Sequence, residues 1–227
     1  MKKSKMQISR REGLTMKLQK LGGYASIILA CITIICVIIV VRTFQGLTGL
    51  DIYDPVKMIA AYQTSTTAFC AFYILGILAA ILTPLPVLAL EERMQTDAPL
   101  LMRLAVIAAF IFSALYLTAM IGGFFRNELL ATTNDMSAFR AFLVMHELLG
   151  SAAGNALGWG FLLSGWTAIR SRKLPQILGY IIILLGIGNV FGFAFTVSQF
   201  NLGIIILQLL NLIVLVWLGI VFLRKNV

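Results

Sequence analysis

The residues best suited to chemistry lie in one apolar stretch, Ala141 to Ile169. It contains the only histidine of the chain, His146, followed directly by Glu147, an acidic residue inside a long apolar run. Residues four apart lie near one face of a helix, so Glu147, Ser151 and Asn155 are predicted to form a polar stripe. A neighbouring stripe is small: His146, Gly150, Gly154 and Gly158. Lipid cannot satisfy a carboxylate, an imidazole and an amide, so other elements must cover this face.

His146 and Glu147 fall about three turns into the predicted helix, near the outer edge of a hydrocarbon core. Their helical positions differ by about 100°, so each needs a partner from elsewhere. The sequence therefore predicts a ligand-binding pocket open to the outer side and lined by His146, Glu147, Ser151, Asn155, Arg126 and Arg140. The competing interpretation is structural: an arginine and a few hydroxyls neutralise Glu147, and His146 closes a helix contact.

A complete catalytic or metal-binding set is not predicted. Ser164 lacks the glycine two residues before it that intramembrane serine proteases of the rhomboid kind require, and it lies far along the helix from His146. A single histidine excludes a haem held by two histidines of one chain; ligation by His146 with a methionine, or across a dimer, stays open. We predict no catalytic and no metal-binding residues, and the sequence identifies no cofactor.

Composition places the chain in a membrane. Of its 227 residues 60% are hydrophobic and 12% charged, and the mean hydropathy is +0.96, unlike a soluble domain. About 20 apolar residues span a bilayer as a helix. Six such runs are predicted: Leu21–Val41, Ala68–Leu90, Leu104–Phe125, Ala141–Ile169, Ile177–Val197 and Leu202–Leu223. We expect an all-α bundle of six transmembrane helices, residues 21–227, after a basic N-terminal segment, residues 1–20.

The distribution of positive charge predicts the orientation. Of 18 lysines and arginines only Arg42, Lys57, Arg126 and Arg140 lie on one side of the predicted spans, and all others lie on the opposite side. The positive-inside rule then places both termini in the cytoplasm. The formal charge of +9 is thus better explained by anionic lipid headgroups than by nucleic acid, and no nucleic-acid partner is predicted.

Local signals predict the element ends. Asp54 before Pro55 is typical of a helix N-cap, and this second helix is expected to continue to about Leu90 with a kink or an end at Thr83-Pro84. The residues from Arg126 to Arg140 are expected to form an outer loop, with N-caps for the next helix at Thr133, Asn134 and Asp135.

Glycines are predicted to join the fourth and fifth spans. Gly150, Gly154 and Gly158 on one, and Gly188 and Gly192 on the other, have the four-residue spacing that lets membrane helices approach closely. The same glycine-rich faces are candidates for contact with a membrane protein partner or a second copy of the chain.

The second half of the chain resembles a known family. The pattern is a histidine followed by small residues, a glycine-rich apolar helix, a basic turn Arg-Ser-x-x-Leu-Pro and a helix that opens with Leu-Gly; here it consists of His146, Gly150, Gly158, Gly160, Arg170, Ser171, Leu174, Pro175, Leu178 and Gly179. It is similar to bacterial six-helix membrane proteins known only as a domain of unknown function. The resemblance implies the six-span fold and a bacterial plasma membrane, and no activity.

Three functional hypotheses follow. The leading one is a non-enzymatic ligand- or lipid-binding, sensory or accessory subunit with an outer polar pocket. The second is a proton-linked small-molecule transporter in which Glu147 titrates. The third is an intramembrane enzyme that uses His146 as a general base. We lean away from an enzyme, because the acidic and basic groups found here do not complete a catalytic set.

Overall fold

The structure is a computed structural model that describes residues 2–43, 54–133, 135–192 and 201–224. These residues form helices and the turns between them, with no strand in the described ranges, which confirms the predicted all-α class. The helices are α1 (Lys2–Thr43), α2 (Pro55–Thr64), α3 (Thr66–Leu82), α4 (Pro84–Met94), α5 (Pro99–Thr133), α6 (Met136–Ser171), α7 (Gln176–Val190) and α9 (Asn201–Leu223).

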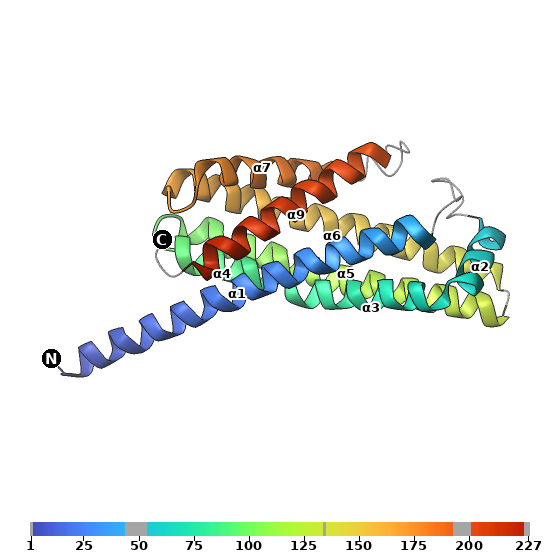
Figure 1. The fold of residues 1–227 in the computed structure, drawn as a ribbon, viewed down its shortest axis with the longest axis horizontal. Helices are drawn as coiled ribbons and strands as arrows, with labels where there is room; N and C mark the ends of the chain where they lie inside the picture. Colours follow the sequence, from blue (N-terminus) through green and yellow to red (C-terminus); the bar gives the residue numbers. More distant parts are fainter. Residues whose placement is uncertain (1, 44–53, 134, 193–200, 225–227) are drawn as a thin grey trace.

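The helices form one elongated bundle. α1, the α3–α4 pair, α5, α6, α7 and α9 run along its long axis in alternating directions (Figure 1). The beginning of α1 and the end of α9 lie at the same end of the bundle, together with the α4–α5 and α6–α7 turns (Figure 1). We call this the terminal end. The opposite end, which carries α2 and the α5–α6 turn, is the distal end (Figure 1).

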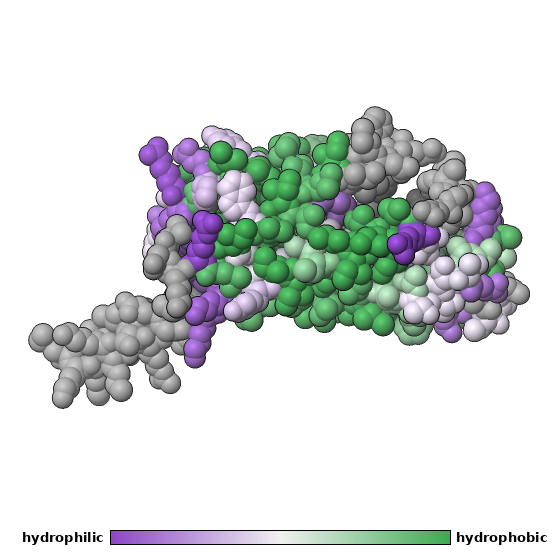
Figure 2. All heavy atoms as spheres, viewed as in Figure 1, coloured by the Kyte–Doolittle hydropathy of each residue, from purple (hydrophilic) through white to green (hydrophobic). Residues whose placement is uncertain are grey.

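The surface has the character of a membrane protein. In Figure 2 apolar residues cover the middle of the bundle and polar residues gather toward both ends. Four helical segments are long and apolar enough to cross a membrane: Lys17–Thr43, Thr66–Met94, Pro99–Leu129 and Ile206–Leu223. α6 is long but rich in glycine and polar residues, and α7 has only 15 described helical residues. The count of six spans therefore stays a prediction.

Several predicted boundaries are confirmed and others are wrong. Asp54 caps α2, because its side chain accepts hydrogen bonds from the backbone nitrogens of Val56 and Lys57. As expected, one helix ends just before Thr83 and the next begins at Pro84. The second helix is not continuous, because a bend at Ser65 separates α2 from α3. α1 runs unbroken from Lys2 to Thr43, so the basic segment and the first predicted span lie on one helix.

The predicted loop from Arg126 to Arg140 is wrong. α5 continues to Thr133 and α6 begins at Met136, capped by Asp135, whose carboxylate accepts from the backbone nitrogens of Ser137 and Ala138 at 2.9 and 3.0 Å. The helix survives the glycine pair 122–123 because both glycines are buried in contact with neighbouring helices. Arg126 is consequently a helical residue inside the bundle and not a loop residue.

α6 and α7 pack backbone against backbone through two glycine pairs. A Cβ on Gly158 would lie 2.8 Å from the carbonyl oxygen of Gly186, and a Cβ on Gly165 would lie 2.9 Å from that of Gly179. Within each helix the two glycines are seven residues apart, so they return to the same face after two turns. Close approach of this kind is how membrane helices gain van der Waals contact without a hydrophobic driving force.

The predicted glycine set is only partly right. Gly158 takes part, whereas no heavy atom of the described residues lies within 4 Å of a Cβ on Gly150, Gly154 or Gly192. α7 ends at Val190, whose carbonyl oxygen accepts from Asn155 Nδ2 at 3.2 Å, and residues 193–200 lie outside the described ranges. α6 extends beyond that point. Association of its open glycine face with a partner helix stays a prediction.

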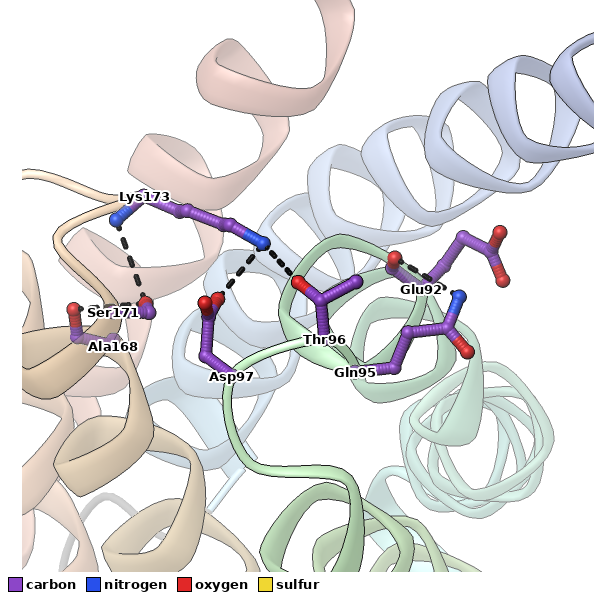
Figure 3. A network of polar contacts seen from close by, with 7 residues as sticks. All are labelled: Glu92, Gln95, Thr96, Asp97, Ala168, Ser171 and Lys173. Atoms are coloured by element: carbon purple, nitrogen blue, oxygen red, sulfur yellow. Dashed lines mark hydrogen bonds and ion pairs between the residues drawn. The ribbon is translucent and has the colours of Figure 1, made fainter.

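At the terminal end one ion pair joins two turns. Lys173 Nζ of the α6–α7 turn lies 2.8 Å from Asp97 Oδ2 of the α4–α5 turn and also donates to Thr96 Oγ1 (Figure 3). Thr96 and Asp97 lie directly before α5, which begins at Pro99. The pair is partly exposed, so its contribution to stability is small and its main effect is to fix how the turns lie.

The glycine pairs give a prediction with a built-in control. Replacing Gly158 by alanine places a methyl group against backbone that cannot move aside, so the free energy of unfolding is expected to fall by about 1–3 kcal/mol. Gly154→Ala adds the same methyl group in open space and is expected to be neutral or stabilising by up to about 1 kcal/mol. Thermal unfolding in detergent measures both. Equal effects at the two positions would contradict the packing described.

Candidate functional site

Three polar side chains are buried together where α3 and α5 meet at the distal end. Arg126, Asn127 and Tyr73 are 6%, 3% and 4% exposed. Arg126 and Asn127 belong to α5, and Tyr73 lies on α3. Polar groups removed from water are costly unless they are hydrogen-bonded, and a charged group is the most costly of all. Their partners therefore decide what this cluster can do.

Hydrogen bonds connect the three side chains to one another. Arg126 Nε donates to Asn127 Oδ1 at 3.1 Å, and Arg126 Nη2 donates to the Tyr73 hydroxyl at 3.4 Å. Asn127 Nδ2 donates to the same hydroxyl at 3.1 Å. The Tyr73 oxygen therefore receives two N–H donors, one charged and one neutral. This triangle fixes the plane of the guanidinium.

The remaining neighbour of the guanidinium is aromatic. Its central carbon lies 5.4 Å from the centroid of the Phe139 ring on α6, a distance at which a ring face attracts a cation. Among the described residues no carboxylate lies within 4 Å of Arg126, and Nη1 donates to none of them. The described neighbours of this buried cation are thus neutral groups, and the Nη1 atom of its guanidinium donates to none of them.

His146 approaches the cluster from α6. Its Nδ1 lies 2.8 Å from the carbonyl oxygen of Ala119 on α5. A carbonyl oxygen only accepts, so Nδ1 carries the proton and Nε2 has the free lone pair when the ring is neutral. The approach depends on Gly123, where a Cβ would lie 2.6 Å from Tyr73 Cε1 and 3.0 Å from His146 Nδ1. Glycine at this position therefore lets α3 and α6 both reach α5.

Glu147 lies beside these groups without a direct partner among the described residues. Its side chain is half-buried, and it directly follows His146 on α6. It forms no ion pair with Arg126, so the predicted neutralisation of Glu147 by an arginine is not seen. The cluster consequently contains a cation and an acid that lie close to shared neighbours but are not paired with each other.

A second contact extends the cluster toward α2. The Tyr62 hydroxyl donates to Glu128 Oε2 at 2.6 Å, and Glu128 follows Asn127 on α5. Burial and the hydrogen bond to this carboxylate raise the pKa of Tyr62, so its hydroxyl stays protonated and remains the donor. The bond holds α2 against the end of α5. Glu128 itself is exposed and turned away from the guanidinium of Arg126.

The other sequence-predicted residues do not join this cluster. Arg140 and Ser151 are exposed, and Asn155 uses its amide on Val190 in the α6–α7 contact. Arg126, His146 and Glu147 are thus brought together, while Arg140, Ser151 and Asn155 lie apart from them.

Sequence analysis missed Tyr73, Asn127 and Phe139. The position of Asn127 next to Arg126 could have indicated that it belongs to the site, but both residues were predicted to lie in an outer loop. Tyr73 and Phe139 are ordinary aromatic residues of apolar helices, and no single-sequence pattern distinguishes the ones that contact a buried charge. A helical reading of the residues after Gly123 would have placed Arg126 one turn from Gly122 and so inside the bundle.

Comparison with known proteins gives no relative: no family model, no curated protein and no solved structure matches the chain.

The double role of the Tyr73 hydroxyl gives a prediction. Tyr73→Phe leaves two buried donors without their shared acceptor, so the free energy of unfolding is expected to fall by about 1–3 kcal/mol. Tyr180→Phe removes the same atom from a side chain that is 60% exposed and is expected to change little. Thermal unfolding of both variants in detergent checks this. A Tyr73→Phe protein as stable as wild type would show that the triangle does not form.

Proposed function

We propose that the chain is a non-enzymatic membrane protein that binds a small ligand through the distal cluster, as a sensory or accessory subunit. In this proposal it crosses a bacterial plasma membrane six times, with both termini in the cytoplasm and the distal end outside. The alternation of helix directions and the concentration of basic residues at the terminal end support this orientation. α6 and α7 supply the two further spans.

The observation that carries the binding proposal is Arg126. A buried guanidinium without a carboxylate near it among the described residues is expensive in a membrane protein. The cost is about 2.5–3.5 kcal/mol at the centre of a transmembrane helix on insertion scales, and this is an upper bound for Arg126, which lies toward the distal end of its span. Proteins accept such a cost where the charge has a use. An anionic ligand would supply the missing partner, and guanidinium groups bind carboxylates and phosphates through two parallel hydrogen bonds.

Each neighbour has a role in this proposal. Asn127 and Tyr73 hold the guanidinium plane through Nε and Nη2, which leaves Nη1 for the ligand. Phe139 covers one face of the cation. His146 presents Nε2, because its Nδ1 is held by the Ala119 carbonyl. The negative charge of Glu147 opposes a second anion nearby, so the site favours ligands with a single compact anionic group.

Anion binding can be tested without knowing the natural ligand. Detergent-solubilised protein is titrated with acetate, inorganic phosphate and sulfate, and the thermal unfolding temperature is recorded. We expect at least one of these anions to raise it at millimolar concentration. In Arg126→Gln the rise is expected to vanish, while Arg140→Gln, at an exposed arginine on the same side, retains it. If none of the anions stabilises wild type, or if Arg126→Gln responds equally, the binding proposal fails.

The second candidate is a proton-linked transporter, and Glu147 favours it. A half-buried carboxylate without an ion pair, beside a histidine and a tyrosine, is the kind of group that carries protons in membrane transport. Protonation of Glu147 would remove a negative charge that opposes a bound anion near Arg126, so anion entry and proton entry would be coupled.

Proteoliposomes containing a pH-sensitive dye test this coupling. For a transporter, an inward acetate or phosphate gradient is expected to acidify the lumen faster than in protein-free liposomes, and Glu147→Gln abolishes the difference. Glu128→Gln is the matched control, since its amide oxygen can still accept from Tyr62. Identical rates for wild type and Glu147→Gln would remove this candidate.

The third hypothesis, an enzyme with His146 as general base, stays a prediction. If it holds, Nε2 is the nitrogen that takes the proton, because Nδ1 is engaged with Ala119.

A further inference from the structure

A groove opens on the bundle surface between the beginning of α7 and the end of α9. The two helices touch near Gly188 and Leu207, where a Cβ on the glycine would meet the leucine side chain at 2.5 Å. They diverge toward the terminal end (Figure 1). Beside this divergence lies a groove of about 740 Å³, lined by one face of α9 and by Pro175, the residue before α7. It is far from the distal cluster. We call it the α7–α9 groove.

One face of α9 forms nearly the whole lining of the groove. Its residues recur with helical spacing from Leu212 to Arg224, and Pro175, directly before α7, closes the terminal end. The walls are apolar: Ile213, Val216 and Ile220 are 48%, 38% and 42% exposed. At this surface of a membrane protein the surroundings are acyl chains, so the occupant must be apolar along most of its length.

The ends of the groove differ in charge. Of the described residues that line the groove, Arg224 alone is charged; it stands at the terminal end, where it is exposed. Arg172, also exposed, lies in the turn three residues before Pro175. No acidic residue is found in the part of the lining that the structure describes. An occupant with an apolar tail and an anionic head would place its tail along α9 and its head at Arg224.

The length of the groove identifies the kind of tail. Leu212 and Arg224 are separated by about 18 Å along the axis, at a rise of 1.5 Å per residue. One leaflet of a bilayer has a hydrocarbon depth of about 15 Å, half of the full core. The groove therefore begins at headgroup level and ends near the midplane. It matches one acyl chain of one leaflet and is too short for a helix that spans the membrane.

From these observations we infer that the α7–α9 groove is a binding site for an anionic phospholipid of the leaflet at the terminal end, with its phosphate at Arg224. This leaflet is the cytoplasmic one if the proposed orientation holds, and the site is independent of the distal cluster. An anionic headgroup is preferred over a zwitterionic one because the choline or amine of the latter is repelled by Arg224.

Native mass spectrometry of the full chain tests the headgroup. Protein in mild detergent is mixed with equal amounts of phosphatidylglycerol and phosphatidylcholine that carry identical acyl chains. We expect about fivefold more bound phosphatidylglycerol, since one basic side chain at a membrane surface contributes about 1 kcal/mol. The ratio is expected to fall toward one in Arg224→Gln and to stay unchanged in Arg140→Gln. A ratio of one in wild type, or an unchanged ratio in Arg224→Gln, would overturn the inference.

A second variant tests the groove itself. Val216→Trp fills the groove from a partly exposed position and is expected to reduce the binding of both lipids at least threefold. Ile107→Trp, at an exposed site on α5, adds the same side chain elsewhere and is expected to leave binding unchanged. If Val216→Trp binds as much lipid as Ile107→Trp, the lipid lies outside the groove and the inference is wrong. Neither variant touches Arg126, so the test is separate from that of the distal site.

Discussion

The distal half of the structure depends on how a buried arginine is satisfied without a carboxylate. Arg126 is 6% exposed, and its contacts among the described residues are an amide, a phenol and an aromatic ring. Each comes with a packing requirement: Tyr73 must reach α5 from α3, and Phe139 must reach it from α6. Gly123 leaves room on α5 for Tyr73 of α3 and for His146 of α6. The cation therefore holds α3, α5 and α6 in fixed positions. A neutral residue at 126 would lose the contacts with Tyr73 and Phe139 that hold them there.

The two halves of the bundle are held by different forces. At the distal end polar bonds connect α2, α3, α5 and α6. In the terminal half, α6 and α7 associate through backbone contact at glycines, around an apolar core that includes Leu178, Ile182 and Leu185. Close glycine contact is rigid because neither side can yield, whereas a polar shell around a charge can respond to a ligand or a proton. This division is consistent with a responsive site at the distal end and a rigid terminal half that supports it.

Much of the fold was predictable because hydropathy and capping are local signals. Asp54 and Asp135 cap helices as expected, and a new helix begins at Pro84. Tertiary contacts were not predictable from one sequence. Gly154 and Gly158 have the same spacing, but only Gly158 meets α7, because α7 ends at Val190. Arg126 was assigned to a loop since its charge suggested water; the structure shows that neighbouring helices provide its partners instead.

The central claim is that Arg126 is a buried cation without a carboxylate partner among the residues that the structure describes. Magnetic dipolar coupling measures this directly in lipid bilayers, between ¹⁵N in the arginine guanidinium groups and ¹³C in the glutamate carboxylates, with Arg126→Gln used to assign the Arg126 signal. In protein freed of bound anions we predict no coupling from Arg126 that corresponds to an ion pair, whose nitrogen and oxygen atoms lie within about 4 Å. A strong coupling to Glu147 would contradict the account, because the cation would then be neutralised internally and the cluster would be structural.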